Sequence, residues 1–264
     1  MKFSKWHALG NAYLLIQRAE AGGPLARELV ERLCDVGTGV GADGVLEVVR
    51  ASASEADIVV WNRDGSRAEF SGNGARIAAG WLSARSGRSE VRLHVGEREV
   101  VARRRGGAIE LELGAVSVGG LEPLAVDGDE LEFVPVSVGN PHAVFRRPAL
   151  AGELDRYGPL IARHERFPAG TNVQFVSVED RVTLRLEVWE RGVGRTRSSG
   201  SSAVAAACAA VVHGWCEAPV TVRLPGAGEL LVDLDSEGWV RLSGPVEEIC
   251  RGEVSGSVAD EKGG

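Results

Sequence analysis

A chain of 264 residues is long enough for one large domain or for two domains of about 130 residues each. Its formal net charge of −7 argues against a nucleic-acid-binding surface, and its 44% hydrophobic and 25% charged residues are typical of a soluble globular protein. The longest apolar run, from Ala203, is too short to span a bilayer, and no charged-then-apolar leader opens the chain. We expect a cytoplasmic protein with a small-molecule partner, and no binding to nucleic acid or membrane.

Most of the chain predicts strands, because β-branched or alternating runs recur between Gly, Pro, Asn and Asp. In the first half the expected strands are residues 3–9, 12–17, 57–62, 91–95, 98–104 and 108–114. In the second half they are residues 133–139, 142–145, 172–178, 182–190, 220–225, 229–234 and 239–244.

Three segments predict helices. PLARELVERLCDV, from Pro24, carries proline in its first turn, where a helix tolerates it. Residues 73–85 and 202–215 are Ala-rich and apolar on most sides, which is typical of buried helices. We therefore expect an α/β (α+β) fold in which each half is a mainly antiparallel, barrel-like sheet around one central helix, with a second helix outside.

The two halves repeat one another at a shift of about 128 residues. Trp61-Asn62-Arg63 aligns with Trp189-Glu190-Arg191, and the same register places Ser71-Gly72 on Ser199-Gly200. At nearly the same shift, Gly10-Asn11 falls on Gly139-Asn140, and residues 41–45 fall on residues 170–174. Three matches in one order predict two duplicated lobes, residues 1–118 and 119–250, joined at a Gly- and Pro-containing turn. Residues 251–264 are expected to form a flexible tail.

Neither a metal site nor a cofactor is expected. Cys34, Cys208, Cys216 and Cys250 include no C-x-x-C pair, and the five histidines show no metal-ligand spacing, so free buried thiols are expected. Pyridoxal phosphate needs an interior Schiff-base lysine, and the lysines are Lys2, Lys5 and Lys262. Residues 37–42 match G-x-G-x-x-A, but they follow a predicted helix instead of a strand, which argues against dinucleotide binding.

In both halves a strand runs into a Ser-Gly pair that opens a buried helix, at Ser71 and at Ser199. Unsatisfied N–H groups and partial positive charge at such a terminus suit a carboxylate. Serine is also a favoured N-cap, which is enough to account for one such serine taken alone. Because the repeat supplies two, we expect both openings to face a cleft between the lobes and to grip one carboxylate from both sides.

Polar side chains gather near these openings, most of them at Gly-rich turns: Asn11, Asn62, Asn73, Asn140, Asn172, Glu190 and Arg191. Each asparagine alone is consistent with ordinary turn chemistry. Together these groups suit a zwitterion, with amide oxygens and Glu190 for an ammonium group, and N–H groups and Arg191 for a carboxylate. His142, which follows Gly139-Asn140-Pro141, is either an acid/base assistant or a satisfied turn residue.

These residues add up to a resemblance to the diaminopimelate epimerases, cofactor-independent amino-acid epimerases of lysine and peptidoglycan biosynthesis. Six segments carry it in the family's order: HALGNAYLLI, GADGVLEV, WNRDGSRAEFSGNGAR, GNPHAVF, GTNVQFVSV and WERGVGRTRSSGSSA. The resemblance implies two pseudo-symmetric α/β lobes, each a strand barrel around a central helix, with the substrate in the cleft between them.

The resemblance also implies roles for individual residues. The helix openings at Gly72-Asn73 and Gly200-Ser201 would hold the carboxylate at the reacting carbon. The distal amino-acid head would be held by Asn62, Asn172, Glu190 and Arg191. Asn11 and Asn140 would also line the site. Ser201 is usually a threonine in the family.

The catalytic pair departs from the family. There, one cysteine thiolate removes the α-proton and a second cysteine thiol returns one on the opposite face; those positions match Ser71 and Ser199. A helix N-terminus can bring the pKa of a thiol from about 8.5 toward neutrality, whereas a serine hydroxyl is far less acidic. Each pKa unit to be overcome costs about 1.4 kcal/mol, so a serine base needs help, for which His142 and Glu190 are the nearby candidates.

Two classes of function therefore stay open. One is an epimerase of LL- or meso-diaminopimelate or a similar amino acid, or a lyase that abstracts a proton on one face only. The other is a binder that has lost the proton relay. Residues 195, 198, 201 and 202 also differ from the family pattern, which favours a natural diverged relative over an engineered double substitution. The role of Arg195 and the oligomeric state, with a homodimer among the alternatives, are left undetermined.

Overall fold

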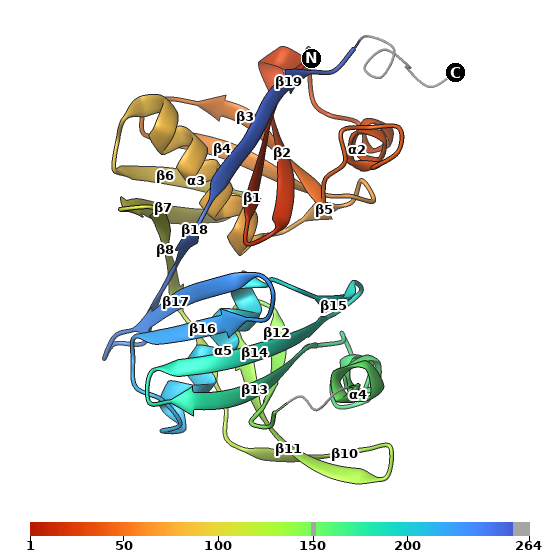
Figure 1. Cartoon of the computed structure of the whole chain (residues 1–264), viewed down its shortest axis with the longest axis vertical. Coiled ribbons are helices and arrows are strands. Elements are labelled where there is room, and N and C mark those ends of the chain that lie inside the picture. Colours follow the sequence, from red (N-terminus) through yellow and green to blue (C-terminus); the bar gives the residue numbers. More distant parts are fainter. Residues whose placement is uncertain (149–151, 256–264) are drawn as a thin grey trace. The chain divides into compact units, whose positions relative to one another are not determined.

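The computed structural model describes residues 1–148 and 152–255, and its backbone divides into two compact units. The first unit comprises Met1–Leu111 together with the segment that starts at Gly244, and the second comprises Glu112–Ser243 (Figure 1). Strands dominate both units and helices are few, so the predicted mixed α/β fold is confirmed. No helix within the described ranges combines the length and the apolar character needed to cross a membrane.

The first unit is built from strands that flank three helices. Its strands are β1 (Lys2–Ala8), β2 (Asn11–Gln17), β3 (Gly44–Ala51), β4 (Glu55–Asn62), β5 (Arg67–Ala68), β6 (Glu90–Val95), β7 (Arg98–Arg105), the first half of β8 (Ala108–Ala115) and β19 (Glu247–Glu253). Its helices are α1 (Arg18–Ala21), α2 (Arg27–Cys34) and α3 (Gly72–Ser86).

The second unit repeats this plan with two helices. Its strands are β9 (Ser117–Val118), β10 (Glu122–Val126), β11 (Asp129–Ser137), β12 (Pro141–Phe145), β13 (Asn172–Asp180), β14 (Thr183–Glu190), β15 (Gly194–Thr196), β16 (Val220–Leu224), β17 (Gly228–Leu234) and most of β18 (Trp239–Pro245). Its helices are α4 (Glu153–Ala162) and α5 (Gly200–Val212).

Strand pairing confirms the sequence repeat. In the first unit β2–β3 and β4–β6 are parallel while β3–β4 is antiparallel; in the second, β12–β13 and β14–β16 are parallel while β13–β14 is antiparallel. The register repeats as well, since Val45 lies opposite Trp61 and Val173 lies opposite Trp189. The turns before Asn11 and Asn140 also match, because Gly10 (φ +83°) and Gly139 (φ +93°) are both left-handed, a conformation that favours glycine.

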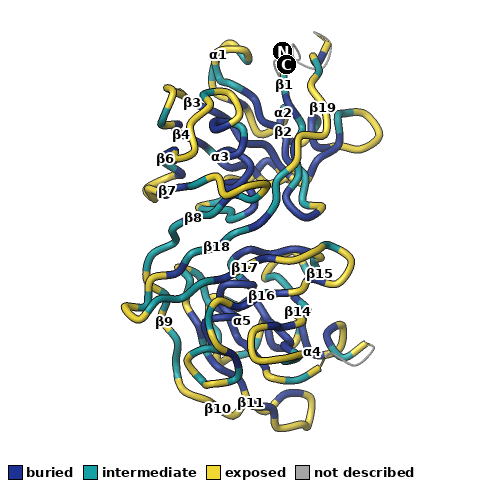
Figure 2. Tube along the Cα trace, turned by 60° about the vertical axis from the view of Figure 1, so that its left-hand side comes forward, coloured by how far each residue is buried: buried dark blue, intermediate teal, exposed yellow. Residues whose placement is uncertain are grey.

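The central helices α3 and α5 form the cores, as predicted (Figure 2). Every residue from Ala203 to Ala210 on α5 is buried, and α3 is buried continuously from Asn73 to Gly80. Small side chains are required at such positions: a Cβ added at Gly80 would lie 2.6 Å from Val246 Cγ2. The outer helices pack through one face, as α4 does where a Cβ at Gly158 would lie 2.8 Å from the Trp189 ring.

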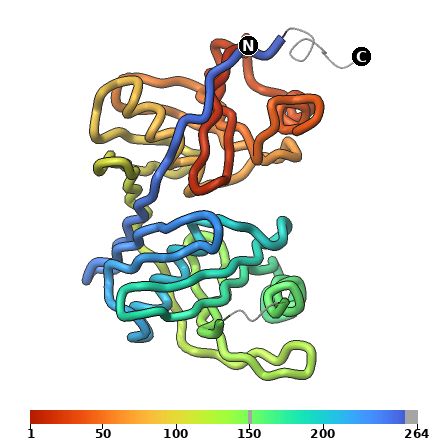
Figure 3. The backbone as a smooth tube through the Cα atoms, viewed as in Figure 1, coloured from red at the N-terminus to blue at the C-terminus, as the bar shows by residue number. Residues whose placement is uncertain are grey.

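The C-terminal segment returns to the first unit, which differs from the predicted boundaries. β19 pairs antiparallel with β1, from Lys2 opposite Glu253 to His7 opposite Glu247, so the first strand and the last described strand lie side by side (Figures 1 and 3). The units therefore divide at residues 111/112 and 243/244, instead of at 118/119 and 250.

The predicted flexible tail is wrong where it overlaps β19. Residues 251–253 belong to that strand, and Val254 is buried with its N–H bonded to Met1 O at 2.8 Å. Residues 256–264 lie outside the described residues. The four cysteines are free thiols, but Cys250, on β19, is exposed instead of buried.

Candidate active site

The first helix opening is capped by Ser71. This residue has an extended backbone (φ −138°, ψ 117°), and α3 begins at the next residue. Its Oγ accepts the Gly74 N–H at 3.0 Å, which caps the helix. The Tyr13 hydroxyl lies 3.2 Å from the same Oγ. Gly74 is tightly enclosed, because a Cβ there would lie 2.9 Å from Leu46 Cδ2. The cap satisfies one of the helix's free N–H groups and leaves others available to a ligand.

The second opening has the same local geometry. Ser199 has φ −141° and ψ 116°, and its Oγ accepts the Ser202 N–H at 3.4 Å. This bond is longer than the one at Ser71, and Ser199 is buried whereas Ser71 is half-buried. The predicted capping role of both serines is confirmed, and two matching openings exist, one in each unit.

In the first unit the structure brings Asn11 and Asn73 together. Asn73 Nδ2 donates to Asn11 Oδ1 at 3.1 Å, and Asn11 Nδ2 donates to Asp43 Oδ2 at 3.2 Å. On the inner side, Arg76 Nη2 donates to Asn73 Oδ1 at 2.7 Å. A chain of side-chain hydrogen bonds therefore ties the first turn of α3 to the β1–β2 turn. Asn62 is not part of it: it is exposed, and its Nδ2 donates to Ser66 Oγ at 2.9 Å within a turn.

In the second unit the ends of β13 and β14 bring Asn172 and Arg191 together. Asn172 Nδ2 donates to Pro141 O at 3.1 Å, and Asn172 Oδ1 accepts the Arg191 N–H at 3.0 Å. The Arg191 guanidinium donates through Nη1 to Ala169 O at 2.7 Å. The amide and the guanidinium are thus held by backbone groups, which fixes their positions before a ligand binds.

His142 lies in a buried polar chain that ends at α5. Gln174 Nε2 donates to His142 Nδ1 at 3.0 Å and to Ser202 Oγ at 2.9 Å, and His142 Nε2 lies 3.0 Å from Asn140 Oδ1. Since the amide N–H₂ donates to Nδ1, the imidazole proton is on Nε2 and points to Asn140. Burial lowers the pKa of His142 to about 3, so the ring is neutral and both nitrogens are engaged. Gln174 gave no signal in the sequence, because its counterpart in the repeated strand register is the apolar Leu46.

Glu190 and Arg195 are neighbours on the β14–β15 hairpin with different electrostatics. Burial raises the pKa of the Glu190 carboxyl to about 7, and a hydrogen bond from Thr196 opposes the shift. A carboxyl with a pKa near neutrality can hold or release a proton at working pH. Arg195 bonds Asp155 Oδ2 at 2.9 Å and Glu187 Oε2 at 2.5 Å, so its guanidinium is engaged by carboxylates of its own unit.

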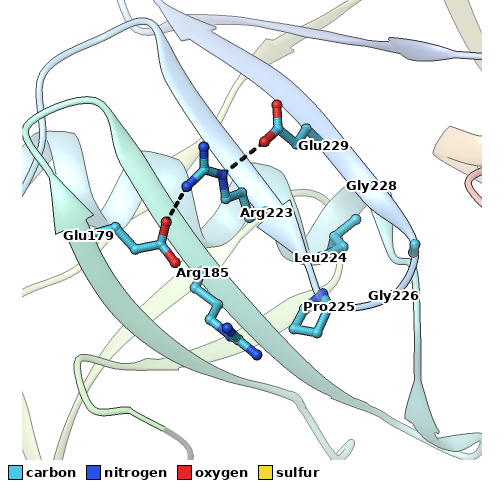
Figure 4. A pocket seen from close by; sticks show the side chains of 9 residues that line it. Glu179, Arg185, Arg223, Leu224, Pro225, Gly226, Gly228 and Glu229 are labelled. Atoms are coloured by element: carbon cyan, nitrogen blue, oxygen red, sulfur yellow. Dashed lines mark hydrogen bonds and ion pairs between the residues drawn. The ribbon is translucent and has the colours of Figure 1, made fainter.

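Among the cavities lined by described residues are two on the second unit. One, of about 490 Å³, lies between the end of α4 and the β14–β15 hairpin; Phe167, Trp189, Arg191 and Val193 are among its lining residues. Its volume is within the range of small-molecule sites, and it includes a predicted site residue. The other, of about 410 Å³, is shown in Figure 4; there Arg223 is paired with Glu179 and Glu229, and none of the predicted site residues lines it.

The sequence and the fold are similar to those of known proteins. The profile of the family described as diaminopimelate epimerase matches residues 3–118 and 134–248. Diaminopimelate epimerase 2 of Nostoc sp. is 34% identical over 278 residues, covering 98% of this chain and 97% of its own. The diaminopimelate epimerase of Corynebacterium glutamicum (strain R) is 36% identical over 272 residues, covering 96% and 97%.

Solved structures agree in fold. A predicted epimerase from Pseudomonas aeruginosa superimposes with a TM-score of 0.70 at 16% identity, over 96% of this chain and 98% of that one. A probable proline racemase from Agrobacterium radiobacter K84, with bound carbonate, gives a TM-score of 0.70 at 16% identity, over 96% and 92%.

Proposed function

The chain belongs to the diaminopimelate epimerase family, a family of isomerases, and on this basis we propose that it epimerises the α-carbon of LL- or meso-diaminopimelate or a similar amino acid without a cofactor. The observation that carries the proposal is the pair of matching helix openings, one in each unit, each capped by serine and followed by glycine. Epimerisation needs one proton-transferring group for each face of the α-carbon, and each unit supplies one candidate.

The substrate carboxylate is proposed to bind the free N–H groups at Gly72-Asn73 and Gly200-Ser201. Helix N-termini favour anions through their unpaired donors and their dipole. The bond that Asn73 donates to Asn11 and the bond that it accepts from Arg76 support this role, because they hold the Asn73 side chain in one rotamer beside the opening. The equivalent support in the second unit is the bond from Gln174 to Ser202.

The distal amino-acid head is proposed to bind Asn172, Glu190 and Arg191. Arg191 is the natural partner of a carboxylate, and Glu190 in its ionised form accepts from an ammonium group. The cavity next to Arg191 supports this assignment. Asn62 is the weakest member of the set, since a ligand would have to replace its bond to Ser66.

The proton-transferring groups are proposed to be Ser71 and Ser199, in place of the family's cysteines. Each hydroxyl accepts a backbone N–H, an interaction that stabilises the oxygen as negative charge develops on it. Glu190, with its raised pKa, is the proposed base that assists them. His142 is proposed to position the second opening through Gln174 instead of transferring protons, because both ring nitrogens are engaged.

A second candidate function is binding of the same amino acid with proton abstraction on one face only, or with none. It is favoured by the contacts of the two hydroxyl groups. The Ser71 hydroxyl contacts the Gly74 N–H and the Tyr13 hydroxyl, and the Ser199 hydroxyl contacts the Ser202 N–H. Among the described residues, no carboxylate or imidazole contacts either oxygen. An unassisted serine is a poor base.

Proton NMR in deuterated buffer separates the two candidates. The proposal predicts loss of the α-hydrogen signals of LL- and meso-diaminopimelate, and predicts that Ser71→Ala and Ser199→Ala each slow that loss by at least about tenfold. Exchange that neither substitution slows would contradict the assignment of the serines. Saturable binding without exchange would establish the second candidate.

A further inference from the structure

Arg76 is an unusual residue in the core of the first unit. It lies one turn inside α3, its side chain is fully buried, and its Nη2 donates to Asn73 Oδ1 at 2.7 Å. Its Nε and Nη1 have no hydrogen-bond partner in the described chain. Buried arginines are rare and are normally paired, because an unpaired buried charge is destabilising. Such a residue calls for a role other than packing.

No carboxylate among the described residues neutralises this charge. Burial alone lowers the pKa of Arg76, to about 10, so the guanidinium remains charged at neutral pH. The strands packed on α3 are β1, β2, β3, β4, β6 and β7, and their buried titratable side chains are Tyr13 and Glu47. Glu47 is engaged elsewhere: its oxygens accept from Arg18 Nε, the Leu25 N–H and Trp61 Nε1. The cation is therefore uncompensated behind the helix opening.

The described part of the second unit has no such charge behind its helix opening. At the repeat shift that aligns Ser71 with Ser199, Asn73 aligns with Ser201 and Arg76 aligns with Val204, which is buried. The two caps have the same backbone geometry, so this substitution is a difference between openings that are otherwise alike. The two openings are thus electrostatically unequal.

We infer that Arg76 is a positioning residue that makes the α3 opening the stronger of the two anion-accepting sites. Its guanidinium orients Asn73 and adds a fixed positive charge behind the first-turn N–H groups. In a low-dielectric interior that charge acts on an anion at residue 71 with little screening. The ligand class is a carboxylate; that it is an amino acid's carboxylate rests on the proposed function, whereas the charge asymmetry does not.

Thiols placed at the two caps report this asymmetry. Ser71→Cys and Ser199→Cys are made separately, each in a Cys250→Ser background, because Cys250 is exposed. The remaining thiols are buried; burial raises the pKa of Cys34 to about 11 and of Cys208 to about 12, and raises that of Cys216. The pH dependence of iodoacetamide alkylation is then followed peptide by peptide with mass spectrometry, which requires neither substrate nor turnover.

The decisive comparison is the effect of Arg76→Met on each thiol. We expect this change to raise the pKa of the cysteine at 71, so that alkylation below that pKa slows about tenfold, and to leave the cysteine at 199 unchanged. Arg76→Lys, which keeps the charge, should preserve the fast alkylation at 71. Tyr13→Phe is the control for the other polar neighbour of Ser71. In a Tyr13→Phe background, Arg76→Met should still slow the alkylation of the cysteine at 71.

An unchanged profile at 71 in a folded Arg76→Met variant would overturn the inference, as would equal changes at both thiols. If the methionine variant does not fold, Arg76→Gln replaces it, since glutamine removes the charge and keeps a donor for Asn73. A negative result in the alkylation test would not contradict the proposed epimerase reaction. Absence of α-hydrogen exchange would not contradict the inference about Arg76. The two failures are therefore distinguishable.

Discussion

At the scale of single residues, the chemistry of the candidate site depends on what surrounds each side chain. Ser71 and Ser199 were identifiable from the sequence because Ser-Gly at the start of a buried helix appears twice at one shift. Their surroundings were not: Tyr13 beside Ser71, and Gln174 between His142 and Ser202, come from strands distant in sequence. Such contacts depend on tertiary packing, so the local sequence pattern does not predict them.

The caps themselves contribute to stability. Ser71→Ala should lower the free energy of unfolding by about 1 kcal/mol, because the Gly74 N–H loses its acceptor, and Ser71→Gly should cost only a few tenths. Ser199→Ala should cost less than Ser71→Ala, since its capping bond is 3.4 Å against 3.0 Å. Urea unfolding of the three variants tests this. Equal stability of Ser71→Ala and the unmodified protein would contradict the capping role.

His142 should make the fold sensitive to acid. The folded state holds the ring neutral, with a pKa of about 3, while the unfolded chain binds a proton below about 6.5. The contribution of His142 to the free energy of unfolding is therefore largest above pH 6.5. It decreases by up to about 5 kcal/mol as the pH falls toward 3. Unfolding at pH 7, 6, 5 and 4 should show a steeper decline for the unmodified protein than for His142→Gln. Parallel curves would argue that the buried ring does not resist protonation.

Glu190 should set the pH dependence of exchange. If the ionised carboxylate assists the serines, α-hydrogen exchange rises with pH through about 7, because burial raises the pKa of the carboxyl to about that value. Glu190→Gln should remove this rise and leave a flat, lower rate. Retention of the same pH profile in the glutamine variant would exclude Glu190 as the base.

At the scale of helices and strands, prediction succeeded where periodicity was strong. The Ala-rich segments became α3 and α5, and alternating runs became strands. Several elements were not predicted, among them β3, β10, β19 and α4. β19 (EEICRGE) is mostly exposed and polar, so nothing in its sequence marks it as a strand, and its pairing with β1 decides its conformation. α4 has a proline in its interior, at Pro159, which weakens a helix prediction.

The alanines of α5 should be intolerant of larger side chains. Ala206→Leu adds volume where the helix is fully buried, and it should destabilise the protein by about 1–3 kcal/mol. The matched control on the same helix is Val212→Leu, at a position that is 57% exposed, and it should be nearly neutral. Thermal unfolding of both variants measures the difference; equal melting temperatures would show that α5 is not closely surrounded.

At the scale of the whole molecule, the duplicated plan was predictable and the division between units was not. The repeat in the sequence corresponds to a repeat in strand order and register. The boundary was misplaced because a chain that returns to its starting unit leaves no composition change at the point of return. The pairing of β19 with β1 shows that the first unit is made of two separate stretches of chain.

Because the first unit includes the C-terminal strand, removal of that strand should destabilise the first unit more than the second. A chain that ends at Pro245 lacks β19 and loses the partner of β1, so its first unit should be strongly destabilised. A chain that ends at Ser255 keeps β19 and is the matched control. The continuous stretch 112–243 should by contrast fold when expressed alone. Hydrogen exchange resolved by peptide checks both units; undiminished protection of β1 and β2 in the shorter chain would contradict the prediction.

We propose that the two serine-capped helix openings hold an amino acid for exchange at its α-carbon. The most direct measurement compares the unmodified protein with the Ser71→Cys/Ser199→Cys double variant, by proton NMR of meso- and LL-diaminopimelate in deuterated buffer. We expect slow loss of the α-hydrogen signals with the serines and faster loss, by at least about a hundredfold, with the cysteines, because a thiol at a helix N-terminus is far more acidic than a hydroxyl. Unchanged α-hydrogen signals with both proteins would contradict it.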